Sequence, residues 1–169
     1  MNATLAAWNG ADQTLALEAM LACCGSHRWA RAMVALRPIA SVVKLSESAD
    51  AVWATMEEPD WMEAFACHPR IGERKAAHAV PKSAAWSAQE QSSASGAAER
   101  VLAELAAGNA LYEERYGFTY IVRATGKSAE EMLSILNRRL AGSREAELRE
   151  AAEQQRQITQ IRLGKWLVE

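Results

Sequence analysis

The sequence predicts an all-α fold, arranged as a single compact domain of about eight helices with no sheet, over residues 1–169. Alanine, leucine, glutamate and arginine dominate, whereas valine and isoleucine are sparse, and this composition favours helix. One run alone looks β-like, FTYIV at 118–122, and one strand cannot form a sheet. No repeat, low-complexity tract or long linker divides the chain, and its length suits one domain.

The first two predicted helices are bounded by glycine, serine and proline. The segment 12–24 carries apolar residues at helical spacing, and Gly25 is expected just after its end. Ser26 is predicted to cap a second helix, HRWARAMVAL at 27–36. This helix must end before Pro38, because proline disfavours helical backbone in the residue that precedes it.

The next two helices flank another proline. A third helix is predicted over 46–56, and Pro59 is expected to separate it from the fourth. Asp60 can cap that short fourth helix, WMEAFAC at 61–67. The segment 68–85 contains two prolines and a glycine and is predicted to be a loop.

Four further helices are predicted in the second half of the chain. The first is long, and Ser95–Gly96 is a weak point within it. The second is closed by Gly117. The four segments are SAQEQSSASGAAERVLAELAAG (87–108), NALYEERYG (109–117), SAEEMLSILNRRLAG (128–142) and REAELREAAEQQRQITQIRLGKWL (144–167).

Charge and composition exclude several classes of function. The formal net charge of −2 gives no reason to expect a nucleic-acid or anionic-membrane partner. The chain has no apolar run long enough to span a membrane, its start lacks signal-peptide features, and its end, KWLVE, is not a peroxisomal signal. The cysteines Cys23, Cys24 and Cys67 are odd in number, which argues against a disulfide framework and favours a cytoplasmic protein with buried thiols.

The stretch AFACHPRIGERKAAH (64–78) holds the first candidate for chemistry. Pro69 biases His68 toward extended backbone, so the imidazole is expected on a rigid corner, which suits an acid or base. A loop histidine bonded to a backbone carbonyl is the alternative. His68, Glu73 and His78 could also form a metal site, but their spacing of five differs from the helical pair of zinc proteases.

The second candidate is the pair Ser87 and Glu90 in WSAQEQ. Its spacing is that of a capping box, in which serine and glutamate satisfy the first amides of a helix. Ser128 and Glu131 have the same spacing, so spacing alone leaves open whether Glu90 does more. The amides of a helix N-terminus at Ser87 could bind a small anionic substrate.

Five segments together resemble one family, the 2-oxo-4-hydroxy-4-carboxy-5-ureidoimidazoline (OHCU) decarboxylases. They are CCGSHRWARAM, HPRIG, SAQEQ, YEERYGFTYIV and ITQIRLGKWL, which occur in the family's order over nearly the whole chain. The resemblance implies an all-helical homodimer that uses no metal or organic cofactor. It further implies conversion of OHCU, a small anionic product of urate oxidation, to (S)-allantoin.

The resemblance also implies residue roles. His68 and Glu90 match the family's catalytic residues, and which of them delivers the stereochemical proton stays open. The positions that match substrate-contacting residues are Pro69, Ser87, Gln91, Tyr120, Ile121, Val122 and Arg162. The chain departs from the family's usual pattern at Ser92–Ser93 and at Thr119–Tyr120, where a hydroxyl is expected near the pocket.

Two alternatives to a cofactor-independent lyase remain at this stage. One is a non-catalytic helical module that binds a protein partner, since a fold does not by itself fix a function. The other is a metal-dependent hydrolase that uses the two histidines and Glu73 named above.

The predicted loop at 68–85 also carries basic side chains that could draw in a small anion or merely be solvated, namely Arg70, Arg74, Lys75 and Lys82.

Overall fold

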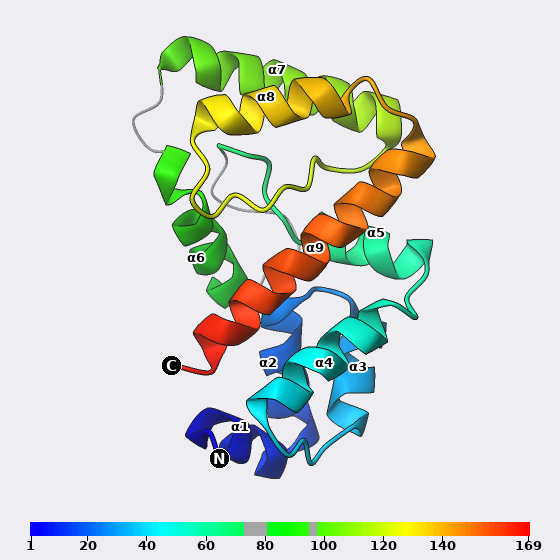
Figure 1. Ribbon diagram of the computed structural model, residues 1–169, viewed down its shortest axis with the longest axis vertical. Helices are drawn as coiled ribbons and strands as arrows, with labels where there is room; N and C mark the ends of the chain where they lie inside the picture. Colours follow the sequence, from blue (N-terminus) through cyan, green and yellow to red (C-terminus); the bar gives the residue numbers. More distant parts are fainter. Residues whose placement is uncertain (73–80, 95–97) are drawn as a thin grey trace. The chain divides into compact units, whose positions relative to one another are not determined.

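A computed structural model describes residues 1–72, 81–94 and 98–169 of the chain. Among these residues it contains nine α-helices, one short 3₁₀ helix and no strand, so the predicted all-α class is confirmed. The residues group into two compact units (Figure 1). The N-terminal unit comprises Met1–Ala64 and Arg156–Glu169, and the central unit comprises Phe65–Gln155. The extent of the domain, 1–169, stays a prediction.

The N-terminal unit is built from short helices whose first turns are capped by side chains. Each cap accepts a hydrogen bond from a backbone N–H of the first turn, which would otherwise lack a partner. The caps are Asn2, Asp12, Ser26 and Ser41. The helices are α1 (Ala3–Gly10), α2 (Gln13–Cys23), α3 (His27–Ala35), α4 (Val42–Trp53) and most of α5 (Glu58–Ala66), with the end of α9 (Arg144–Trp166).

Tryptophans fill the interior of this unit. Trp29 is fully buried and its indole N–H donates to the carbonyl of Ala49, so an apolar ring is buried without leaving its polar atom unpaired. Trp8 packs edge-on against Trp166, with ring centroids 6.1 Å apart. Cys23 and Cys24 are also buried, as the sequence predicted, whereas Cys67, in the central unit, is partly exposed.

The central unit contains α6 (Pro81–Glu90), the 3₁₀ turn η1 (Ser92–Ala94), α7 (Glu99–Tyr116), α8 (Ala129–Arg139) and the first part of α9. In Figure 1, α7 and α8 lie side by side, and an extended segment joins them. Its core is a cluster of aromatic rings from α5, α7 and the extended segment, namely Phe65, Tyr112, Tyr116, Phe118 and Tyr120.

Several boundaries in the N-terminal half differ from those predicted. Helix α1 was not predicted, and it accounts for the ninth helix. Helix α4 begins at Val42 rather than at residue 46 and ends at Trp53. Pro59 lies within the first turn of α5 instead of separating two helices, which is allowed because amides of the first turn have no partner within the helix.

The long helix predicted over 87–108 is wrong. Helix α6 begins earlier, at Pro81, where proline is well suited to a first helical position, and it ends at Glu90. The next α-helix begins at Glu99 and runs through residue 109 to Tyr116, so 109–117 is not a separate helix. Gly117 does close it, in the left-handed conformation that glycine adopts without steric cost. The predicted weak point at 95–96 lies outside the described residues.

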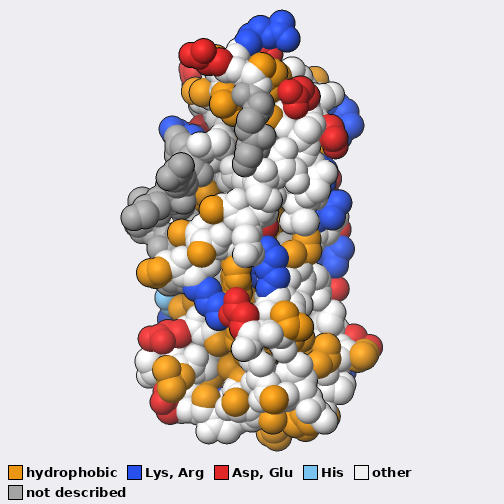
Figure 2. All heavy atoms as spheres, turned by 90° about the vertical axis from the view of Figure 1, so that its left-hand side faces the viewer, with side chains coloured by type: hydrophobic (Ala, Val, Ile, Leu, Met, Phe, Trp, Pro, Cys, Tyr) orange, Lys and Arg blue, Asp and Glu red, His pale blue; other side chains and the backbone are white. Residues whose placement is uncertain are grey.

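No helix in the described part of the chain is both long and apolar enough to cross a membrane. On the face that Figure 2 shows, basic and acidic side chains are interspersed with scattered hydrophobic ones. This mixture agrees with the near-neutral net charge.

Candidate functional site

His68 lies in the turn that ends α5. Its backbone N–H donates to the carbonyl of Phe65 over 3.1 Å, and the buried Pro69 follows it. The backbone of His68 is thus held by the end of the helix on one side and by the fixed φ of proline on the other. This is the rigid corner that the sequence predicted.

Two further interactions hold the segment that follows His68. The guanidinium of Arg70 makes a bidentate pair with Glu113 of α7, at 2.7 and 2.6 Å. The N–H of Gly72 donates to Oε1 of Gln91 over 2.9 Å. Gly72 has a φ of 94°, in the left-handed region where glycine is favoured. Gln91 therefore ties the HPRIG segment to the end of α6, next to Glu90.

The bidentate pair changes the interpretation of the loop's positive charge. The hydrogen bond from Arg70 lowers the pKa of Glu113 below its ordinary value, so the pair is ionised and the charge of Arg70 is largely compensated. Lys82 lies in the first turn of α6, over the ring of Trp86. Arg74 and Lys75 lie outside the described residues. The expectation that Arg70 draws in a small anion is therefore not supported.

The side chain of His68 meets a buried glutamine. Its Nε2 lies 2.6 Å from Oε1 of Gln155 on α9, a residue without any exposed surface. An amide oxygen can only accept a hydrogen bond, so with the amide in this orientation Nε2 is the donor. The partner of this nitrogen is a side chain and not the backbone carbonyl of the predicted alternative.

Helix α6 turns an unusually polar face inward. Ser83, Trp86, Ser87 and Glu90 recur at helical spacing and are all buried, with Glu90 8% exposed. Polar groups are costly to bury unless they are hydrogen-bonded, so a mostly polar buried face is typical of a binding or catalytic site rather than of a helix packed only for stability. Ser87 and Glu90 thus share one face.

The capping-box interpretation of Ser87 and Glu90 is wrong. Both residues lie in the second half of α6, and the N–H of Gln91 donates to the carbonyl of Ser87, as within a helix. No helix begins at Ser87, so its neighbouring amides do not form the predicted anion site. Ser128 is a true cap, because its hydroxyl accepts from the N–H of Glu131 over 3.1 Å.

The extended segment before α8 contains the other predicted contact residues. The hydroxyl of Tyr120 donates to the carbonyl of Met132, and burial raises the pKa of this phenol well above its ordinary value. The expected hydroxyl near the pocket is therefore directed at α8. The carbonyl of Ile121 accepts a hydrogen bond from the guanidinium of Arg139. Two residues later, the backbone N–H of Arg123 donates to Oε1 of Gln154 over 2.8 Å.

A buried ion pair supports this segment. Arg139, 5% exposed, bonds Oε1 of Glu147 at 2.7 Å. Its guanidinium also lies over the rings of Tyr112 and Tyr120, with distances to the centroids of 5.8 and 5.0 Å. The same side chain that neutralises Glu147 therefore fixes the backbone of Ile121.

Arg162 belongs to the N-terminal unit, whereas the other predicted site residues belong to the central unit. It is 2% exposed, and its Nη1 makes a long hydrogen bond of 3.5 Å to the carbonyl of Ala22. The proposed metal ligands Glu73 and His78 lie outside the described residues. Within the described ranges, no group of three potential metal-ligand side chains occurs.

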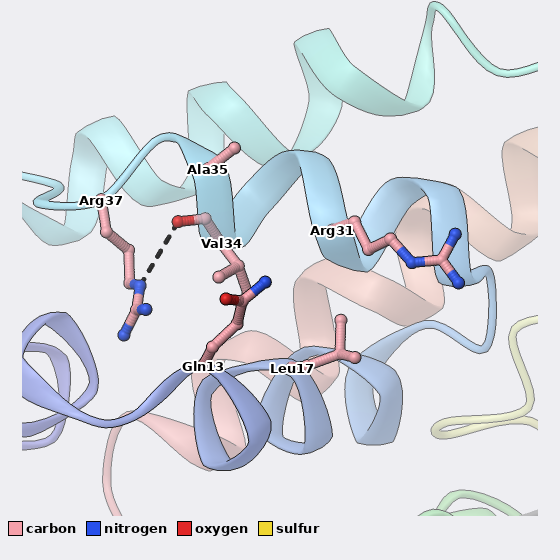
Figure 3. A pocket seen from close by; sticks show the side chains of 6 residues that line it. All are labelled: Gln13, Leu17, Arg31, Val34, Ala35 and Arg37. Carbon is pink, nitrogen blue, oxygen red and sulfur yellow. Dashed lines mark hydrogen bonds between the residues drawn. The ribbon is translucent and has the colours of Figure 1, made fainter.

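A pocket of about 230 Å³ opens in the N-terminal unit between α2 and α3 (Figure 3). Its lining includes Arg31 and Arg37, but Arg37 donates to the carbonyls of Trp8, Ala11 and Val34. The pocket contains none of the predicted site residues. Arg37 is therefore committed to holding backbone carbonyls at the ends of α1 and α3.

Sequence reasoning missed Ser83 and Gln155. Both interrupt a buried helical stripe with a polar residue: Ser83 one turn before Ser87, and Gln155 between Ala151 and Ile158. A polar residue at a core position of an amphipathic helix was the available signal.

Comparison with known proteins gives three findings. Residues 9–164 match the model of the family described as OHCU decarboxylase. The uric acid degradation bifunctional protein TTL of Arabidopsis thaliana is 35% identical over 144 residues, covering 85% of this chain and 44% of that protein. The chain thus spans less than half the length of this relative. A crystal structure of OHCU decarboxylase in the presence of (S)-allantoin matches with a TM-score of 0.76 and 32% identity, over 88% of this chain and 96% of that one.

A more distant structure shares the fold alone. It is a crystal structure of (S)-allantoin synthase, matched with a TM-score of 0.71 and 17% identity over 96% of this chain and 53% of that one.

Proposed function

Because the chain belongs to the OHCU decarboxylase family, we propose that it is a carboxy-lyase that converts OHCU to (S)-allantoin during urate degradation. The observation that carries this proposal is the match with an OHCU decarboxylase structure over nearly the whole of that chain. The site agrees with it, because the central unit combines a rigidly placed histidine with a helix whose buried face ends in a carboxylate.

The substrate itself can accept the electrons that decarboxylation releases. In OHCU the carbon that bears the carboxylate lies beside a ring C=N bond. When the carboxylate leaves as CO₂, its bonding pair can form a double bond to the imine carbon while the C=N pair moves onto nitrogen, which takes up a proton. The former imine carbon then takes up a proton as the hydroxyl loses its own and becomes the carbonyl of allantoin. The enzyme then needs to orient the substrate and move protons, tasks for which two acid–base groups suffice.

We assign these tasks to His68 and Glu90. His68 would donate a proton close to the departing carboxylate, and Glu90 would orient the ring and its hydroxyl group. Pro69, Ser87 and Gln91 flank these two residues in sequence. The remaining contacts are proposed for the backbone of Tyr120, Ile121 and Val122 and for the guanidinium of Arg162, whose planar fork suits an anionic oxygen.

The test is to generate OHCU in situ by enzymatic oxidation and hydrolysis of urate and then add the protein. We expect faster loss of OHCU than in buffer, together with a circular dichroism signal from a single allantoin enantiomer. A protein that neither accelerates the loss nor gives optically active product would contradict the proposal.

Two further properties belong to the proposal. We propose that the protein is a homodimer in the cytoplasm, on the basis of the family resemblance and of three cysteines that form no disulfide, two of them buried. Light scattering coupled to size exclusion would show a mass near twice 18.5 kDa if the first is right. A monomer in that experiment would refute it.

A further inference from the structure

Gln155 is a buried amide at a core position of α9. Its side chain has no exposed surface, and Ala151, Ala152 and Ile158 of the same helix are buried around it. Burying an amide costs free energy unless its polar atoms find partners. The glutamine is therefore suited to a specific hydrogen bond rather than to packing, and its oxygen lies 2.6 Å from Nε2 of His68.

The orientation of the Gln155 amide, with its oxygen toward Nε2, gives this hydrogen bond a direction. Because the amide oxygen has no hydrogen, the shared proton belongs to Nε2 of His68. A neutral imidazole carries a proton on only one nitrogen, and the partner of one nitrogen decides which. Holding the proton on Nε2 leaves Nδ1 as the nitrogen whose protonation changes.

We infer that Gln155 is a positioning residue that keeps the proton of His68 on Nε2, so that Nδ1 exchanges a proton with the substrate. This inference rests on the proposed function for its catalytic part. As an imidazolium, His68 would give its Nδ1 proton to the former imine carbon. The pair left by CO₂ forms a double bond to that carbon while the C=N pair moves onto nitrogen, which takes up a proton; the double-bond pair then becomes the new C–H bond as the hydroxyl loses its proton and becomes a carbonyl. The neutral ring then keeps Nε2–H, and Gln155 accepts the same hydrogen bond before and after the step.

The placement of Gln155 supports this role. It lies on a helix, where backbone hydrogen bonds fix a side chain's origin more tightly than a loop does. The preceding residue, Gln154, accepts from the N–H of Arg123, directly after the proposed contact segment. One turn of α9 therefore holds both the imidazole and the end of that segment.

The first test needs no substrate and no variant of Gln155. The protein contains only three histidines, so ¹⁵N spectra of the ring nitrogens are simple, and a His68→Asn variant identifies the signals of His68. In neutral His68 we expect a protonated Nε2 and an unprotonated Nδ1. The opposite tautomer would overturn the inference, even if the protein proves to be an active decarboxylase. If the protein shows the expected tautomer but has no decarboxylase activity, the proposed function is refuted and the inference about Gln155 and the His68 tautomer stands.

The second test separates positioning from packing. Gln155→Met keeps the length of the side chain but replaces the strong acceptor with a weak one, whereas Gln155→Glu keeps an acceptor at the same place. For Gln155→Met we expect a mixture of His68 tautomers and a loss in kcat of about 10–100-fold, with little change in KM, as for other residues that orient a functional imidazole. Gln155→Glu should restore the Nε2 tautomer.

Gln154→Met is the matched control for the tautomer alone, because it makes the same change one residue away and Gln154 bonds the backbone of Arg123 and not His68. Its His68 signals should equal those of the unmodified protein. If a folded Gln155→Met variant keeps both the tautomer and the kcat of the unmodified protein, the inference is wrong. If the variant does not fold, the tautomer of the unmodified protein still decides the question.

Discussion

Replacing Glu147 with glutamine tests whether the buried ion pair stabilises the central unit. Arg139 and Glu147 have side chains only 5% and 7% exposed, and they meet at 2.7 Å. Glutamine keeps the shape of glutamate and an oxygen that accepts hydrogen bonds, but it removes the negative charge. The guanidinium then stays buried without a compensating charge, because the pKa of arginine is too high for it to lose its proton.

The expected loss is large. Removing one partner of a buried pair costs about 3–5 kcal/mol. Arg139 keeps its bonds to the carbonyl of Ile121 and to the hydroxyl of Tyr112, so we expect a value near the lower end, about 3 kcal/mol. For a chain of this length, 1 kcal/mol corresponds to about 2–4 °C in Tm, so Tm should fall by about 6–12 °C.

The assay is urea unfolding at pH 7, followed by circular dichroism, with a thermal melt in parallel. Glu145→Gln is the matched control on the same helix, since its partner Arg149 and Glu145 itself are 75% and 78% exposed. An exposed pair contributes about 0–1 kcal/mol, so this variant should unfold almost as the unmodified protein does. Equal losses for Glu147→Gln and Glu145→Gln would refute the idea that the charge of Arg139 depends on Glu147.

The remaining predictions concern the site and its loop. His68→Asn should lower kcat about 10²–10⁴-fold with an unchanged melt, because asparagine cannot exchange a proton; near-normal turnover in a folded variant would remove His68 from the mechanism. Glu90→Gln should lower kcat comparably, while Glu131→Gln, which keeps a residue that capping boxes accept, should leave turnover unchanged; equal losses would mean that Glu90 is structural. Arg70→Met should destabilise the protein by up to about 1 kcal/mol at neutral pH and by less in acid. The sign follows from the lowered pKa of Glu113. The stabilisation from the ionised Glu113 is present above its pKa in the unfolded chain and is lost as pH falls through its pKa in the folded protein. Unfolding measured at pH 7 and in acid should therefore show a smaller difference between Arg70→Met and the unmodified protein in acid.

The sequence by itself determined the features that depend on neighbours along the chain. Ser26 and Ser128 cap their helices because a serine hydroxyl reaches the amide three residues later. Gly117 ends α7 because its left-handed backbone suits glycine. Pro69 places His68 outside a helix for an equally local reason. The helical class and most helices followed from such signals, and the order of the motifs indicated the family.

Only the tertiary structure decided which residues meet. His68 and Gln155 lie 87 positions apart in sequence, and no local rule relates them. Ser87 and Glu90 have the spacing of a cap, yet α6 begins at Pro81, so the same spacing places them on one buried face. Helix periodicity fixes which residues share a face, but packing against distant segments decides whether that face is a core, a surface or a site. For Gln155, burial beside His68 turns a polar residue of α9 into a hydrogen-bond partner of the proposed catalytic histidine.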